Sequence, residues 1–177
     1  MDDNYVLSER KRTACFTGHR SLPDGDGRAR LISAVDAMIA AAVSRGYRNF
    51  ISGGAVGFDT LAACRVALAK RRIPEIKLYL ALPCRNQTEK WTRVEDIALY
   101  KQLLAAASDV CYISEFYTST CMFERNRFMV DRSALCIAYC IRQKGGSAYT
   151  MNYAKKSGLG IINLGAGSYS AEEFSRF

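Results

Sequence analysis

The sequence predicts an α/β protein, a Rossmann-like three-layer sandwich with a mostly parallel sheet. Short apolar runs bounded by turn residues alternate along the chain with segments of helical periodicity. Strands that alternate with helices favour a parallel sheet covered on both faces. With 177 residues, the chain is expected to form one domain over residues 1–177.

The predicted strands are short enough to be buried strands of a parallel sheet. They cover residues 13–17, 49–52, 77–82, 109–113, 135–141 and 160–164. Pro83 and the polar residues 84–90 are predicted to close the third strand and to form the loop that follows it.

The predicted helices lie between these strands. Their periodicity covers residues 29–45, 60–70, 94–107 and 149–156. Gly46 follows the first helix as a helix-ending glycine, and Pro74 follows the second helix where that helix must stop.

Composition limits the class of protein. The chain is 49% hydrophobic and 24% charged, which is typical of a globular protein. No apolar run reaches the roughly 18 residues that cross a membrane, and the N-terminus lacks the pattern of a signal peptide. We therefore expect a cytoplasmic protein without membrane contact.

The seven cysteines form no C-x-x-C pair and there is a single histidine, so we expect reduced cysteines and no metal site.

The net charge of +8 favours anionic partners, including nucleic acid. Basic residues gather at 10–12, at 70–72 and at 125–132. We interpret the first two clusters as solvated helix ends and turns. The third lies within a motif.

The first motif, Thr17-Gly18-His19-Arg20, directly follows the first predicted strand. Glycine lets the backbone approach a ligand, and the three polar side chains offer donors to phosphate or ribose oxygens. A solvated turn explains this short motif equally well when it is taken alone.

The second motif spans residues 52–59 and contains Gly53, Gly54, Ala55, Gly57 and Asp59. Its glycines allow a tight turn before a helix, where backbone N–H groups can hold an anion. It is neither the G-x-G-x-x-G dinucleotide motif nor a P-loop. The Asp59 side chain could either cap the helix that follows or contact a ligand, and the sequence leaves both roles open.

The third motif spans residues 124–131, where Arg125 and Asn126 could point into a site and Glu124 and Asp131 are candidate catalytic acids. An amphipathic helix with solvated arginines accounts for the same charges.

The fourth motif is a second glycine-rich turn, with Gly145, Gly146, Ser147 and Thr150. Like the second motif, it offers backbone amides and hydroxyls that can hold an anion beside the carboxyl end of a strand.

Together the four motifs resemble the YpsA-like branch of the SLOG superfamily, which is related to DprA and to the LOG phosphoribohydrolases. The resemblance rests on residues 17–20, 53–59, 125–131 and 145–150. It implies a Rossmann-like fold and a pocket for a nucleotide-related ligand. LOG enzymes carry P-G-G-x-G-T-x-x-E, whereas this chain has Lys144 in place of the proline and Asn152 and Tyr153 near the expected acid. That departure argues against LOG chemistry.

The leading hypothesis is therefore the binding or sensing of a small nucleotide-derived molecule, of the ADP-ribose or NAD type, with no other cofactor assigned. A second is hydrolysis of an N-glycosidic or nucleotide bond by Asp59, Glu124 or Asp131. A third, DprA-like hypothesis is single-stranded DNA binding, for which ten tyrosines and the basic charge would be suited. The oligomeric state stays open, a homo-oligomer included.

Overall fold

The computed structural model describes residues 9–166; residues 1–8 and 167–177 of the expected domain lie outside the described part. Its centre is a six-stranded sheet in the order β4-β3-β2-β1-β5-β6, in which all paired neighbours are parallel. The strands are β1 (Thr13–Gly18), β2 (Asn49–Ser52), β3 (Lys77–Cys84), β4 (Asp109–Ser114), β5 (Leu135–Tyr139) and β6 (Gly160–Asn163).

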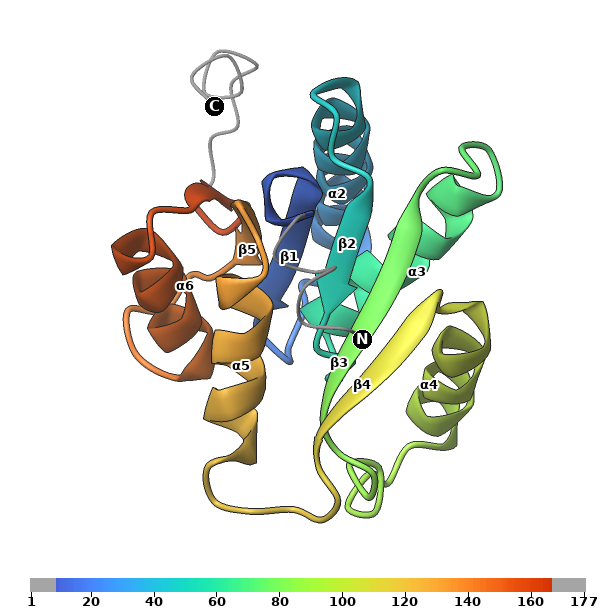
Figure 1. Cartoon of the computed structure of the whole chain (residues 1–177). Helices are drawn as coiled ribbons and strands as arrows, with labels where there is room; N and C mark the ends of the chain where they lie inside the picture. The colour runs from blue at the N-terminus through green and yellow to red at the C-terminus, as the bar shows by residue number, and fades with distance from the viewer. Residues whose placement is uncertain (1–8, 167–177) are drawn as a thin grey trace.

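Helices cover both faces of this sheet (Figure 1). They are α2 (Gly25–Ser44), α3 (Phe58–Lys70), α4 (Val94–Ala106), α5 (Cys121–Asp131) and α6 (Gly146–Lys156), and a short 3-10 turn, η1 (Arg10–Arg12), precedes β1. Helices α2, α3 and α4 lie on one face, and α5 and α6 lie side by side on the other. The predicted fold class is confirmed. No helix within residues 9–166 is long and apolar enough to cross a membrane.

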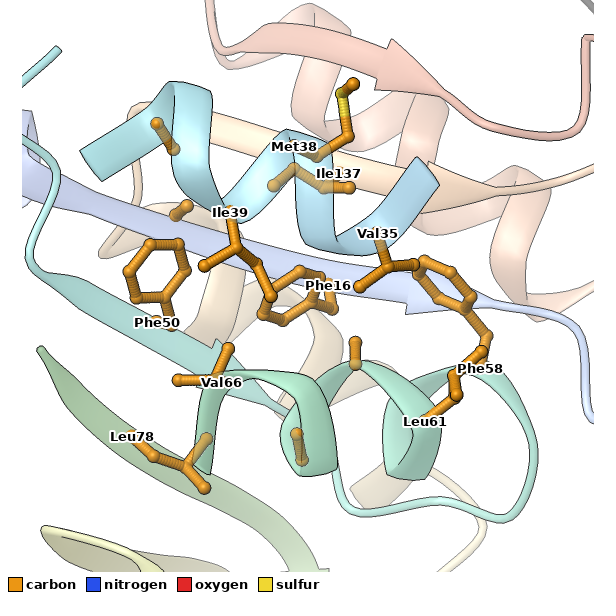
Figure 2. Close-up of a cluster of buried hydrophobic side chains, with 14 of the residues drawn as sticks. Phe16, Val35, Met38, Ile39, Phe50, Phe58, Leu61, Val66, Leu78 and Ile137 are labelled. Carbon is orange, nitrogen blue, oxygen red and sulfur yellow. The ribbon is translucent and has the colours of Figure 1, made fainter. Parts of the chain in front are cut away.

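Large apolar side chains fill the space between the sheet and helices α2 and α3 (Figure 2). Phe16 of β1 is fully buried at the centre. Its ring stacks on Phe50 of β2 at 6.1 Å and meets the edge of Phe58 at 6.4 Å. Alternation along β1 sends Ala14 and Phe16 to this face and Cys15 to the other.

On the opposite face of the sheet, strands β1 and β5 contribute small residues. Cys15, Cys136 and Ala138 lie there against Met129 and Val130 of α5. All seven cysteines are free thiols, and Cys15 and Cys136 are register partners on neighbouring strands. Small side chains leave room for α5 and α6 to lie close to the sheet.

The strand order reverses direction next to β1. The chain runs outward from β1 through β2 and β3 to β4, then crosses to β5 on the other side of β1. Ligands of open α/β sheets bind at such a switch point, beyond the carboxyl ends of the strands. The topology therefore predicts a binding site at the carboxyl ends of β1 and β5.

Several boundaries differ from those predicted. Strand β3 continues through Pro83 to Cys84, whereas the sequence predicted a loop from Pro83. Strand β2 pairs with β3 only as far as Ser52 opposite Leu80, so Pro83 lies beyond the end of that neighbour, where a missing N–H is tolerated. Gly46, with φ +91°, follows α2 as predicted.

Candidate functional site

A pocket of about 450 Å³ opens at the switch point between β1 and β5. Its walls come from the end of β1 and the segment after it, from the loop before α3 and the first turn of α3, from the first turns of α5, and from the loop between β5 and α6 with the start of α6. The lining residues are Thr17, Gly18, His19, Arg20, Ser21, Ala55, Asp59, Met122, Arg125, Asn126, Ile141, Arg142, Lys144, Gly145, Gly146 and Ser147.

The pocket lining is strongly basic. Arg20, Arg125, Arg142 and Lys144 bring positive charge to it from three different segments, and Asp59 is the carboxyl group among the lining residues. Arg20, Arg142 and Lys144 are exposed, whereas Arg125 is only 5% exposed. Cations gathered in a concave site raise the local concentration of anions.

Helix α6 begins in the wall of this pocket. Gly145 precedes it with φ +107°, a conformation that favours glycine. Within residues 9–166 no side chain caps this end of the helix, and its first turn holds no acidic residue. The Thr150 hydroxyl donates to the Gly146 carbonyl at 2.8 Å and so braces the first turn. The helix N-terminus therefore presents free N–H groups and the positive end of its dipole beside Lys144.

The β5–α6 loop, residues 140–145, is held at its start from two sides. From β6, the Asn163 amide both accepts from the Cys140 N–H at 2.9 Å and donates to the Cys140 carbonyl at 2.8 Å. From the end of β1, His19 Nε2 accepts the Ile141 N–H at 2.8 Å and the Arg142 N–H at 3.3 Å. These contacts fix the direction in which the loop enters the pocket.

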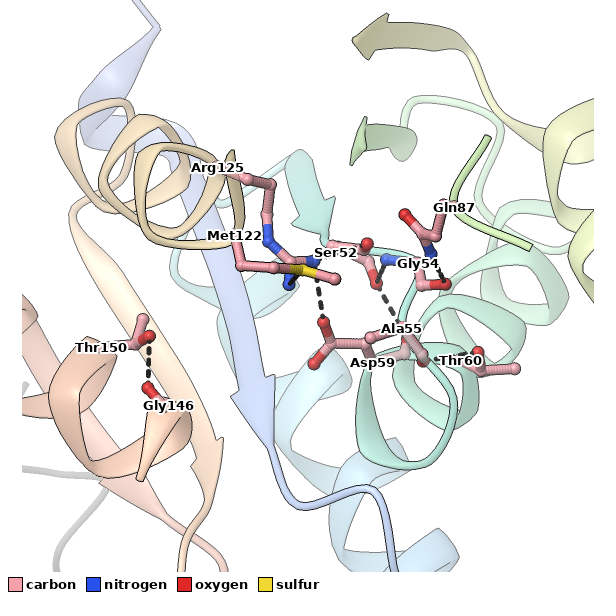
Figure 3. A network of polar contacts seen from close by, with 11 residues as sticks. Ser52, Gly54, Ala55, Asp59, Thr60, Gln87, Met122, Arg125, Gly146 and Thr150 are labelled. Carbon is pink, nitrogen blue, oxygen red and sulfur yellow. Dashed lines mark hydrogen bonds and ion pairs between the residues drawn. The ribbon is translucent and has the colours of Figure 1, made fainter. Parts of the chain in front are cut away.

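Arg125 and Asp59 form a buried ion pair on the floor of the pocket (Figure 3). Their closest atoms, Arg125 Nη1 and Asp59 Oδ2, lie 3.4 Å apart. Arg125 Nη1 also donates to the Gly53 carbonyl, while its buried Nε has no hydrogen-bond partner among the residues that the structure describes. Helix α5 and the loop before α3 are thereby linked through one side chain.

Burial raises the pKa of Asp59 to about 6, and the nearby Arg125 charge offsets only part of that rise. Backbone hydrogen bonds from Ala55 and Gly18 also favour the carboxylate, as does the charge of Arg20. Burial lowers the pKa of Arg125, and Asp59 opposes that change. A carboxyl group that titrates close to neutral pH in a pocket is suited to proton transfer.

The glycine-rich loop before α3 is used for internal packing. A Cβ on Gly53 would collide with the Arg125 guanidinium. A Cβ on Gly57, whose φ is +97°, would lie 2.4 Å from the Arg20 carbonyl oxygen. The glycines here let the loop lie against α5 and against the segment after β1. Ala55 of this loop and Asp59 in the first turn of α3 reach the pocket.

Two of the three candidate catalytic acids, Glu124 and Asp131, lie outside the pocket lining. Glu124 is exposed on α5. Asp131, at the last residue of the same helix, accepts a hydrogen bond from the Tyr153 hydroxyl at 2.9 Å. Asp59 is thus the acid that the fold brings to the site.

Most of the predicted ligand-binding residues come together in one place. Those in the lining are Thr17, Gly18, His19, Arg20, Ala55, Asp59, Arg125, Asn126, Gly145, Gly146 and Ser147, whereas Gly53, Gly54, Gly57 and Thr150 are not lining residues. Sequence reasoning missed Ser21, Met122, Ile141, Arg142 and Lys144 as site residues. Arg142 and Lys144 could have been found, because they precede the Gly145-Gly146 turn, whereas nothing in the sequence marks Met122.

Residues 15–159 match the family model described as YspA SLOG family. The chain is also similar to the SPbeta prophage-derived protein YoqJ of Bacillus subtilis (strain 168), with 31% identity over 124 residues, 63% of this chain and 72% of that protein.

Two solved structures share the fold at low sequence identity. DNA processing protein A (DprA) from Streptococcus pneumoniae superposes with a TM-score of 0.64 at 16% identity, over 96% of this chain and 54% of that one. DprA from Helicobacter pylori gives a TM-score of 0.61 at 18% identity, over 91% and 68%. The chain therefore spans about half the length of the Streptococcus protein.

Proposed function

This chain belongs to the YspA SLOG family, and from that membership and its pocket we propose that it binds a nucleotide or nucleotide-derived molecule of the ADP-ribose or NAD type. The phosphate groups would lie at the start of α6. The remaining lining would hold the ribose and base.

The observation that carries this proposal is the uncapped start of α6 in a basic pocket. Free N–H groups at a helix N-terminus bind phosphate, and here they adjoin Lys144 and Arg142 in the same lining. The volume of about 450 Å³ falls within the range of small-molecule sites. Met122 and Ile141 add apolar surface for a base or a ribose.

The proposal is tested by thermal shift and calorimetry against NAD, ADP-ribose, AMP, cyclic nucleotides and nucleotide sugars. A ligand at about 100 times its dissociation constant should stabilise the fold by about 2.7 kcal/mol. We expect the shift to be lost in the double variant R142A/K144A. R71A/R72A removes the same charge from exposed positions outside the pocket and should keep it. If no compound of the panel gives a thermal shift or a heat of binding, the proposal is refuted.

A second candidate function is hydrolysis of the bound molecule at its N-glycosidic or phosphate bond. Asp59 supports it, since this buried acid lines the pocket and its pKa of about 6 suits general acid–base catalysis. Product analysis of every stabilising mixture tests it. Turnover that disappears in D59N while binding persists would establish hydrolysis, and binding without products would restrict the protein to sensing.

A third candidate is single-stranded nucleic acid. The Helicobacter protein of this fold has a described single-stranded DNA binding mode. Here Phe116 and Tyr117 are 70% and 56% exposed in the loop after β4, and Lys90 lies 5.4 Å from the Tyr117 ring centroid. Aromatic rings beside cations can stack bases and hold the backbone. Binding of a short oligonucleotide that weakens steeply with salt, and fails in F116A/Y117A, would support this role.

A further inference from the structure

His19 occupies an unusual position in the pocket, because its side chain accepts hydrogen bonds from the backbone. Nε2 lies 2.8 Å from the Ile141 nitrogen and 3.3 Å from the Arg142 nitrogen. Both nitrogens are N–H donors, so the contact requires a lone pair on Nε2. The backbone of position 19 also donates to the Tyr139 carbonyl at 3.1 Å, and the imidazole meets the Tyr139 ring edge-on at 5.9 Å.

These contacts determine the protonation state of the ring. An imidazole that accepts through Nε2 carries its proton on Nδ1 when neutral, and the imidazolium has no lone pair left to accept with. Protonation would therefore set an N–H group against two other N–H groups. The Ile141 and Arg142 amides could then not keep their present contacts with the ring, and Asn163 alone would hold the start of the loop at Cys140.

We propose that His19 is a positioning residue for the phosphate site: as a neutral imidazole protonated on Nδ1, it latches the start of the β5–α6 loop, and acid releases this latch. The loop leads within four residues from Ile141 to Gly145, where α6 is about to begin. A released loop would move Arg142, Lys144 and the α6 N-terminus relative to β1. The ligand part of this inference rests on the proposed function, but the latch itself does not.

The surrounding charges favour the neutral ring at pH 7.5. Burial lowers the pKa of His19 below 6.5, and the charge of Arg142 lowers it further. Arg20, Arg125 and Lys144 line the same pocket from the other segments, and Asp59 opposes them from the start of α3. Because the folded pKa lies below the unfolded value, the latch is intact above pH 6.5 and is lost as the pH falls through the folded pKa.

Long-range ¹H–¹⁵N NMR of the full chain tests the latch directly, because the sequence holds a single histidine. At pH 7.5 we expect the neutral Nδ1–H tautomer. On acidification, the Ile141 and Arg142 amide signals should titrate together with the ring at a midpoint below pH 6.5. An Nε2–H tautomer, an imidazolium at pH 7.5, or a ring that titrates without those amides would overturn the proposal.

Variants separate the latch from general stability. Glutamine reaches the position of Nε2 with an acceptor oxygen, whereas the side chain of asparagine is too short. In H19A and H19N, hydrogen exchange at Ile141 and Arg142 should speed up about tenfold, the worth of one hydrogen bond, and H19Q should largely restore protection. The amide of position 19 serves as an internal control, since its bond to Tyr139 should persist. Equal exchange in H19A and the wild type would refute the latch.

Ligand binding gives the last test, with AMP as the probe at pH 7.5. We expect AMP affinity to fall about tenfold in H19A and to return in H19Q. AMP affinity that is unchanged in H19A would contradict a role for the latch at the site. If AMP and the rest of the panel fail to bind the wild type, the proposed function fails, while the tautomer and exchange results still decide the latch.

Discussion

Arg125 and Asp59 carry opposite charges, yet burial opposes the charged form of each. The pKa of Asp59 rises from 3.8 to about 6 in spite of the guanidinium beside it. Because the folded pKa exceeds the unfolded one, the stability that Asp59 contributes is full below pH 3.8 and is lost as the pH rises through 6. Arg125 limits that loss and also satisfies the Gly53 carbonyl.

This balance predicts that the stability lost in the variant R125M depends on pH. At pH 8 the variant leaves the buried Asp59 without its guanidinium partner, and the backbone hydrogen bonds from Ala55 and Gly18 and the charge of Arg20 compensate only in part, so the free energy of unfolding should fall by about 3–5 kcal/mol. At pH 5 the carboxyl group is mostly protonated, and the loss should be smaller. Urea denaturation at the two pH values measures the difference.

The double variant D59N/R125M is the control for that experiment, because it removes the titrating group together with its partner. Its stability should vary less with pH than that of R125M. If R125M lowers the free energy of unfolding equally at pH 5 and pH 8, Arg125 stabilises the protein by packing and not by its charge.

At the scale of elements, the start of α6 can be tested by adding one methyl group. A Cβ on Gly146 meets no atom within 4 Å, so G146A should change stability by no more than about 1 kcal/mol. The same methyl group lies in the pocket wall, and AMP should bind about tenfold more weakly, a loss of about 1.4 kcal/mol. Thermal denaturation and calorimetry on the same sample measure both.

G145A provides the contrast to G146A. Its Cβ also meets open space, but its φ of +107° is costly for alanine, so it should lose about 1–2 kcal/mol of stability. If G146A binds AMP as tightly as the wild type does, the phosphate groups do not lie at the start of α6.

The sequence predicted the type and order of these elements better than their ends. Four ordered motifs identified the family correctly, because glycines at strand ends meet the backbone requirements of the tight turns in this fold. The start of α6 was predicted three residues late, at 149 and not at Gly146, since glycine and serine are weak helix formers. The glycines of residues 53–57 were the strongest local signal for ligand contact, but their packing against Arg125 depends on α5, which lies far away in the sequence.

At the scale of the whole molecule, the central strand supports both the core and the site. Phe16 packs against Phe50 and Phe58 on one face of the sheet, and β1 ends directly in the pocket at Thr17 and Gly18. Stability and site geometry should therefore be lost together when this strand is weakened.

F16A should lower the free energy of unfolding by about 3–5 kcal/mol through the lost burial and the cavity left behind. F116A makes the same chemical change at a side chain that is 70% exposed and should cost less than about 0.5 kcal/mol. Chemical denaturation of both variants measures the contrast. Similar losses would show that Phe116 is covered in solution.

The clamp by Asn163 has a consequence for biosynthesis. The loop after β5 is fixed by an amide group that the ribosome adds more than twenty residues later. A nascent chain that ends before position 163 can pair β1 with β5, yet of the two contacts that hold the β5–α6 loop it has only the one from His19. The loop should thus reach its final position only after Asn163 has been synthesised and β6 has paired with β5.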